Sequence, residues 1–389
     1  GLMMHTDLER SAAFLLRNAG PVIRYRLRRE ILGDLDAASE ASLLAEICEL
    51  PLFRRLLTYV KPDGYIGSGM HSWDNWRGTV LHETPLQDGE CAARLLSYYR
   101  IPKTHPVVRN FVAAMRDEEI LRAEFSYIPP EIPRFENRFA GIRSGNCLMA
   151  LLYTMQAMLG YGDDYEDLRD FQQIALRGFA ALRGLNSLAD ITCFDPHAKR
   201  RYNCPYIDEN VYLPNAYTLE MLAYTRAWRS DANRRLLAEA INRMDEMPED
   251  GNRIQIRIRG KYMAPGWALV RPFRPFRADC IDTIMYRRPL TELAMLGLGS
   301  AADVLRVSAE NIREAMDADG ILRLDFRRLR NKRYSPKSIE YPGAYVDVRL
   351  EADYADETAL LCDLTFWAVE FLHLYENGKG TETDGKELG

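Results

Sequence analysis

Residues 145–182 read GNCLMALLYTMQAMLGYGDDYEDLRDFQQIALRGFAAL, and this stretch decides the fold prediction. Its first part is apolar over a broad face as far as Gly160 and Gly162, whereas its second part carries apolar residues at three- and four-residue spacings. Glycine is favoured just after a helix, and an acidic side chain such as Asp163 or Asp164 is favoured at the N-cap of the next helix. The stretch therefore predicts a helical hairpin with a broadly apolar first helix and an amphipathic second helix.

The same pattern begins again near residues 88, 215 and 289, so the hairpin recurs along the chain. The second helices are expected to begin near four residues: His105, Tyr165, Asp231 and Ala301. Such a hairpin cannot bury both faces alone and must stack on its neighbours, in an open solenoid or in a ring of inner and outer helices. We therefore predict an all-α fold, an α/α toroid that is an incomplete or complete ring of about five to six hairpins.

The domain prediction takes residues 1–378 as a single α/α-toroid domain, in which residues 1–80 close or cap the ring. Residues 379–389 are expected to form a disordered tail, because they are polar and rich in glycine. Short β-hairpin insertions are expected in the loops, since RIQIRIRG at 253–260 alternates polar and apolar residues, as do ILRLDF at 321–326 and YVDVRLEADY at 345–354.

Composition places the chain of 389 residues among soluble globular proteins, with 47% apolar and 28% charged residues. A net charge of -5 argues against general binding of nucleic acid or of anionic membranes. No apolar run is long enough for a membrane span, and the first twenty or so residues lack the pattern of a secretory signal. The 7 cysteines are odd in number and scattered, which favours the reducing cytoplasm over a disulfide framework.

Two stretches resemble a known superfamily. AGPVIRYRLRREILG at 19–33 resembles the helix that opens many bacterial squalene-cyclase-like proteins. LGYGDDYEDLRDF at 159–171 resembles the hairpin repeats of the terpenoid cyclase and protein prenyltransferase α/α-toroid superfamily. The resemblance implies a ring with a central small-molecule cavity at one end. It carries no reaction over, because the acid and Gln…Trp motifs of the cyclases are not matched, and DITC at 190–193 departs from the tight Asp-x-Cys of the prenyltransferases.

The loops before the first helices are rich in Trp, Tyr, Arg, His and Pro, and inserts on one side of each repeat line a binding face. GSGMHSWDNWRGTVLHET at 67–84 is the densest of them. Three of its residues are predicted to supply acid-base chemistry near neutral pH: His71, Asp74 and His82. Trp73, Trp76 and a later Trp267 are predicted to wall the pocket. The alternative is that the tryptophans anchor the loop and the histidines hydrogen-bond to backbone.

The loop at 190–209 combines aromatic residues with metal-ligating residue types. Tyr202 and Tyr206 are predicted to contact the ligand or to pack the loop. Asp190, Cys193 and His197 are side chains of the kinds that zinc prefers, although their spacing is not that of a standard zinc finger. Apart from this zinc ion, no cofactor is expected.

An arginine-rich run at 271–277 precedes a predicted helix start and points to an anion. Arg271 and Arg274 are predicted to hold a phosphate or carboxylate group, since guanidinium groups near a helix N-terminus favour such ligands. The alternative is arginine packed on phenylalanine and paired with nearby acids. Tyr345, in the last long loop, is predicted to line the same pocket.

These features predict a protein with a central pocket for an apolar or anionic small molecule, and they leave open whether it is an enzyme that acts on that molecule. One rival is a carbohydrate-active α/α-ring hydrolase or lyase, which would use paired acids such as Asp88 with Glu90, or Glu351 with its neighbours. Another is a non-enzymatic helical-repeat scaffold. A small-molecule ligand is expected. Binding of nucleic acid and a membrane span are not expected, and the oligomeric state stays open.

Overall fold

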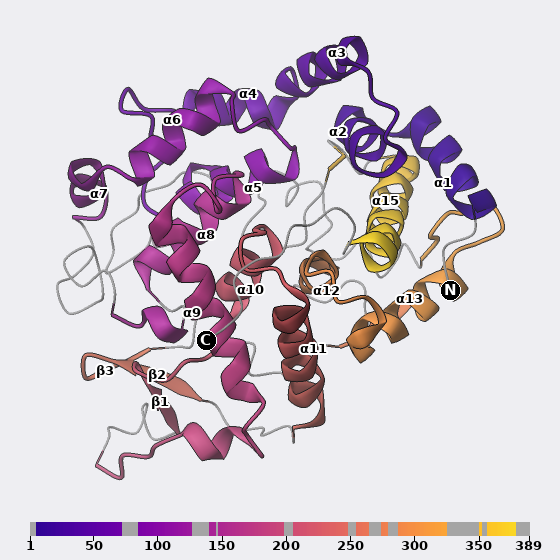
Figure 1. Ribbon diagram of the computed structural model, residues 1–389. Coiled ribbons are helices and arrows are strands. Elements are labelled where there is room, and N and C mark those ends of the chain that lie inside the picture. The colour runs from indigo at the N-terminus through magenta and orange to yellow at the C-terminus, as the bar shows by residue number, and fades with distance from the viewer. Residues whose placement is uncertain are drawn as a thin grey trace. The chain divides into compact units, whose positions relative to one another are not determined.

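The computed structural model describes residues 5–71, 85–126, 140–144, 147–197, 205–247, 254–263, 274–278, 287–324, 350–351 and 356–378. Within these residues the chain forms 14 α-helices and one 3-stranded sheet (Figure 1). The all-α prediction is therefore confirmed. Among the described helices, none has both the length and the apolar character needed to cross a membrane.

The chain divides into two compact units, each described here by itself. The first unit comprises Gly1–Ala114, Pro275–Ser300 and Leu305–Lys379. The second unit comprises Met115–Arg274, Ala301–Val304 and Gly380–Gly389. The single-domain assignment of residues 1–378 stays a prediction, and the predicted tail at 379–389 lies outside the described residues.

Helices of the first unit come from both ends of the chain. They are α1 (His5–Asn18), α2 (Pro21–Arg26), α3 (Ala37–Cys48), α4 (Pro51–Thr58), α5 (Gly89–Tyr98), α6 (Pro106–Met115, ending in the second unit), α12 (Arg287–Met295), α13 (Asp303–Ala315, beginning in the second unit) and α15 (Glu357–Asn377). A π-helical turn (Leu27–Leu32) continues α2, and a 3-10 turn (Pro85–Gln87) precedes α5.

The second unit holds the remaining elements. They are α7 (Glu118–Glu124), α8 (Leu148–Met158), α9 (Glu166–Leu182), α10 (Ala216–Ala223), α11 (Asp231–Glu246), β1 (Tyr206–Asp208), β2 (Gln255–Ile258) and β3 (Lys261–Met263). 3-10 turns lie at Ile142–Ser144, Leu188–Ile191 and Gly299–Ala301, the last shared with the first unit.

The helices of the four predicted hairpins are present in chain order, namely α5 and α6, α8 and α9, α10 and α11, and α12 and α13, and α8 packs against α9. Each second helix begins within two residues of its predicted start. Every residue of α5, α8 and α10 is buried, whereas α9 and α11 keep one solvated face. A broadly apolar helix is stable only when surrounded, and an amphipathic one needs cover on one stripe.

Packing within the second unit follows the repeat: α8 contacts α10, and α9 contacts both α10 and α11 (Figure 1). The turns between helices are joined by Asp163, whose carboxylate accepts the backbone N–H groups of Arg226 at 2.9 Å and Ala227 at 2.8 Å. The predicted capping role of Asp163 or Asp164 is therefore wrong, because Tyr165 is the N-cap of α9. Ser230 does cap α11, as its sequence position indicates.

The small sheet contains the predicted hairpin, since the described part of RIQIRIRG, from Ile254 to Gly260, contains β2 and the turn to β3. Arg259 and Gly260 occupy that turn with φ of 51° and 77°, the left-handed conformation that a two-residue hairpin turn requires. β1 adds to β2 in parallel, with Tyr206 opposite Gln255.

In the first unit, α15 is buried continuously from Leu360 to Leu372 and is packed by α1, α2 and α12 (Figure 1). Arg26 of α2 pairs with Glu370 of α15 and lies over the Phe366 ring at 5.1 Å. Glu30, in the π-helical turn, bonds Arg100 at 2.7 Å. The charged side chains of Arg26, Glu30, Arg100 and Glu370 therefore link α15 to α2, to the π-helical turn and to the residues after α5.

Candidate functional site

Backbone hydrogen bonds join the loop that carries His71 to the start of α5. Ser68 donates its N–H to the Gln87 carbonyl at 2.7 Å, and Gly89 donates its N–H to the Gly69 carbonyl at 3.3 Å. The N-cap of α5 is Asp88, whose Oδ1 accepts the N–H groups of Glu90 at 2.7 Å and of His71 at 3.0 Å. One carboxylate therefore starts the helix and fixes the backbone of His71.

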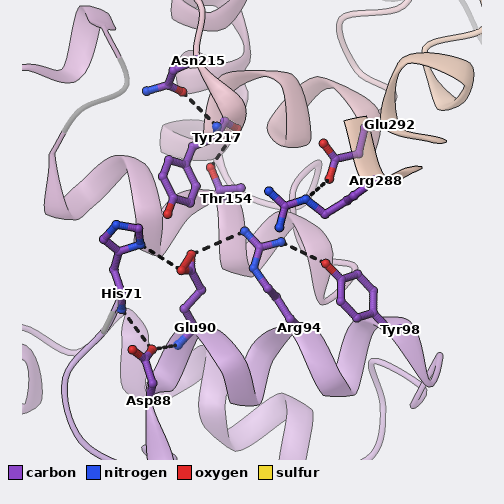
Figure 2. A network of polar contacts seen from close by, with 10 residues as sticks. All are labelled: His71, Asp88, Glu90, Arg94, Tyr98, Thr154, Asn215, Tyr217, Arg288 and Glu292. Atoms are coloured by element: carbon purple, nitrogen blue, oxygen red, sulfur yellow. Dashed lines mark hydrogen bonds and ion pairs between the residues drawn. The ribbon is translucent and has the colours of Figure 1, made fainter. Parts of the chain in front are cut away.

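His71 lies against Glu90, and Figure 2 shows the two side chains pointing toward one another. The distance from Nδ1 of His71 to Oε1 of Glu90 is 3.0 Å, and the side chains are 20% and 2% exposed. His71 has a φ of 63°, which is uncommon for a residue with a Cβ atom and marks a conformation imposed by its surroundings.

A ladder of polar groups continues from Glu90 along one face of α5 (Figure 2). Oε2 of Glu90 lies 3.4 Å from Nη2 of Arg94, and Nη1 of Arg94 donates to the Tyr98 hydroxyl at 3.1 Å. The spacing of four residues places all three on one side of the helix. Charged groups in a wholly buried helix carry a large desolvation cost, so this ladder is a candidate for function as well as for structure.

The electrostatics favour the protonated imidazole. Burial by itself disfavours the charged form of His71, but the attraction of Glu90, a hydrogen bond from the ring to the Glu90 carboxylate and the charge of Asp88 outweigh it and raise the pKa of His71. Arg94 opposes this shift through its own charge. The site is therefore able to hold a proton near neutral pH on a side chain that is partly exposed.

Other buried helices also carry polar groups. On α12, Arg288 pairs with Glu292 at 3.3 Å, with both side chains about 5% exposed or less (Figure 2). In the second unit, Thr154 of α8 donates to the Tyr217 carbonyl of α10 at 3.1 Å, and Asn215 caps that helix. These buried polar groups are satisfied by an ion pair, a helix–helix hydrogen bond and a helix cap.

Several predicted site residues lie outside the described residues, and their roles stay predictions. They are Trp73, Asp74, Trp76, His82, Tyr202, Trp267, Arg271 and Tyr345.

Tyr206 and Arg274 are described. Tyr206 is buried in β1, makes a T-shaped contact with Tyr262 at 5.4 Å and lies under the Arg257 guanidinium at 4.7 Å. These contacts fit the alternative role of loop packing. Arg274 is exposed, just before the buried Phe276.

The residues proposed for zinc have other contacts. Asp190 accepts the N–H groups of Asn186 and Ser187 in a helix-capping arrangement. Cys193 pairs through its backbone with Tyr206, and His197 is exposed. Among the described residues no three His, Cys, Asp or Glu side chains form a group that could hold a metal. The zinc site therefore stays a prediction.

The acidic residues that were predicted as catalytic pairs have different roles in the structure. Asp356 is the N-cap of α15, like Asp88 on α5, so both serve as helix caps. Glu351 accepts the Gly20 N–H at 2.8 Å, and burial together with the charge of Asp363 raises the pKa of Glu351 to about 7. Glu351 therefore differs from an ordinary helix-start acid.

Arg94 and Tyr98 were not identified from the sequence, although a weak signal was present. Within the apolar stretch Gly89–Tyr98, Glu90, Arg94 and Tyr98 recur every four residues. On an amphipathic helix such a row would face solvent; on a helix buried all round, it has to be satisfied internally.

Replacing Asp88 with alanine is expected to lower stability by about 2 kcal/mol, at the upper end of N-cap losses, because the carboxylate also holds the His71 N–H. Asp88→Asn, which keeps an acceptor oxygen, should lose much less. The measurement is the urea midpoint. Asp117→Ala, which removes only the exposed cap of the short helix α7, is the control. Equal losses in Asp88→Ala and Asp117→Ala would contradict the double role of Asp88.

Comparisons of the chain with protein-family models, with curated proteins and with solved structures find no significant match.

Proposed function

We propose that this chain is an enzyme that acts on an apolar or anionic small molecule and that His71 transfers the proton in its reaction. The observation that carries the proposal is the pairing of His71 with the buried carboxylate of Glu90 at the start of α5. A hydrogen bond from Nδ1–H to a carboxylate fixes the imidazole tautomer and makes Nε2 the basic nitrogen, as in catalytic acid-base groups.

The proposed architecture is an α/α toroid of the terpenoid-cyclase-like type. It is supported by the alternation of wholly buried first helices with amphipathic second helices, and by the stacking of α8 on α10 and of α9 on α11. In such a ring the buried helices form the inner layer, and their ends line the mouth.

The test is a screen for ligand binding, followed by an assay of whether the chain converts each bound compound. Geranyl and farnesyl diphosphate and a set of nitrophenyl glycosides are assayed for a shift in melting temperature, and every binder is assayed for product by mass spectrometry. His71→Gln is expected to reduce turnover of the binder by at least about a hundredfold, which is typical for loss of a general acid or base.

The matched control is His105→Gln. His105 belongs to the same unit, contacts the Phe53 ring in a T-shaped arrangement and accepts the Val107 N–H through Nδ1. It should leave turnover near the wild-type rate. Wild-type turnover in His71→Gln would overturn the proposal. Absence of turnover with every probe would also overturn it and favour the helical-repeat scaffold.

Hydrolysis of carbohydrates is the second candidate, and Glu351 favours it. Glycosidases need one carboxyl group that stays protonated near neutral pH beside a second that is ionised. The pKa of Glu351, raised to about 7 beside Asp363, meets the first requirement. Turnover of a glycoside that is lost in Glu351→Gln and retained in His71→Gln would select this function over the first.

A further inference from the structure

The carboxylate of Glu90 lies between two cationic groups. Its Oε1 is 3.0 Å from the His71 imidazole, and its Oε2 is 3.4 Å from the Arg94 guanidinium. Arg94 is fully buried and also donates to Tyr98, so the guanidinium is held at both ends. The four groups form one row, from the partly exposed imidazole of His71 to the buried phenol of Tyr98 (Figure 2).

Burial alone would favour the neutral carboxylic acid at Glu90, because a desolvated anion is costly. A protonated carboxyl group would lose its attraction for the imidazolium of His71. An arginine stays charged in any protein environment, whereas His71 changes its charge during proton transfer. Arg94 is therefore a permanent cation beside Glu90, and it stabilises the Glu90 anion whether or not His71 carries a proton.

We propose that Arg94 is a positioning residue, which holds Glu90 as an anion against Nδ1 of His71 and thereby fixes the imidazole for proton transfer. This inference deepens the proposed function and rests on it for the role of His71. Arg94 itself does not touch the substrate in this scheme.

The test asks whether the pKa of His71 rises or falls when Arg94 is replaced. Arg94 acts on His71 in two opposite ways. Directly, its positive charge lowers the pKa of His71. Indirectly, by keeping Glu90 ionised, it sustains the attraction that raises the same pKa. If only the direct effect operated, Arg94→Met would raise the pKa of His71; under our proposal Glu90 becomes protonated, and the pKa falls.

The experiment is an NMR titration of the His71 ring in the full chain, assigned by its loss in His71→Gln. Arg94→Met is expected to lower the pKa of His71 by about one unit, the size of shift that a nearby charge produces. Arg94→Lys, which keeps the charge, should remain closer to the wild type. Glu90→Gln should lower the pKa as well, and adding Arg94→Met to it should lower it no further. A rise in Arg94→Met, or a further fall in the double variant, would overturn the proposal.

Tyr98→Phe provides the second variant if Arg94→Met does not fold. It removes the hydroxyl that orients Arg94 and is expected to lower the pKa of His71 by a smaller amount; an unchanged pKa would count against the proposal. Because the titration needs no substrate, it separates the two hypotheses. Suppose that Arg94→Met lowers the pKa of His71 and that His71→Gln keeps wild-type turnover. Arg94 would then position Glu90 and His71 as proposed, but His71 would not transfer the proton in the reaction.

Discussion

Replacing Gly67 with alanine is expected to destabilise the protein by about 2 to 5 kcal/mol and to displace His71 from Glu90. Gly67 has a φ of 73°, and a Cβ atom there would lie 1.9 Å from the Gln87 carbonyl oxygen. That oxygen belongs to the backbone and accepts the Ser68 N–H, so neither partner can move without separating the loop from α5. The free energy of unfolding from urea titration gives the loss, and the pKa of His71 should return toward its ordinary value.

Gly33→Ala is the matched control in the same unit. Gly33 has a φ of 65°, and nothing lies within 4 Å of a Cβ atom built there. It carries the left-handed strain of about 1 to 2 kcal/mol without the collision. Equal losses in the two variants would show that strain alone accounts for Gly67, and that the contact with Gln87 does not fix the loop.

Replacing Glu351 with glutamine is expected to stabilise the protein at pH 8 by up to about 3 kcal/mol. The pKa of Glu351 is about 7 in the folded chain, against 4.5 for an unperturbed glutamate side chain. The folded state therefore binds the proton more tightly than the unfolded state. The stability that this proton contributes is fully present below pH 4.5 and is lost as the pH rises through about 7. The difference of 2.5 units between these two pKa values, at about 1.4 kcal/mol each, sets the upper limit.

Glutamine is neutral at every pH and keeps the oxygen that accepts the Gly20 N–H. The gain from Glu351→Gln should therefore be large at pH 8 and vanish near pH 4.5, as followed by urea unfolding across that range. Glu357→Gln, at an exposed acid in the first turn of α15, should change stability by less than about 1 kcal/mol. A gain in Glu351→Gln that does not depend on pH would contradict the raised pKa.

The hairpins were predictable because their signals are local. Helical periodicity and turn residues lie within a few residues of each other, so α9 and α11 begin where the pattern places them. The cap of α9 was not predictable. Asp163 has the right residue type and position, yet it bonds to Arg226 and Ala227, which lie more than sixty residues away and reach it only after α10 packs on α8 and α9.

In the candidate site, too, some features were predictable from the local sequence and others depend on contacts made by folding. His71 was identified from its residue type and its aromatic loop, and Asp88 and Glu90 were noticed as acids near a helix start. Their roles differ, since Asp88 caps α5 and Glu90 faces His71. Acids at a helix start cannot be told apart by spacing alone. Only the folded loop decides which one meets the imidazole.

The sequence by itself determined the helical hairpins, their approximate starts and the short β-hairpin, because each depends on contacts along a few consecutive residues. The tertiary structure decided that α5 is buried on every side, that the row from Glu90 to Tyr98 is enclosed, and that Glu351 lies beside Asp363. Burial and charge proximity set pKa values, and both are sums over neighbours from distant parts of the chain. For that reason the chemistry of His71 and Glu351 became visible only once the chain was folded.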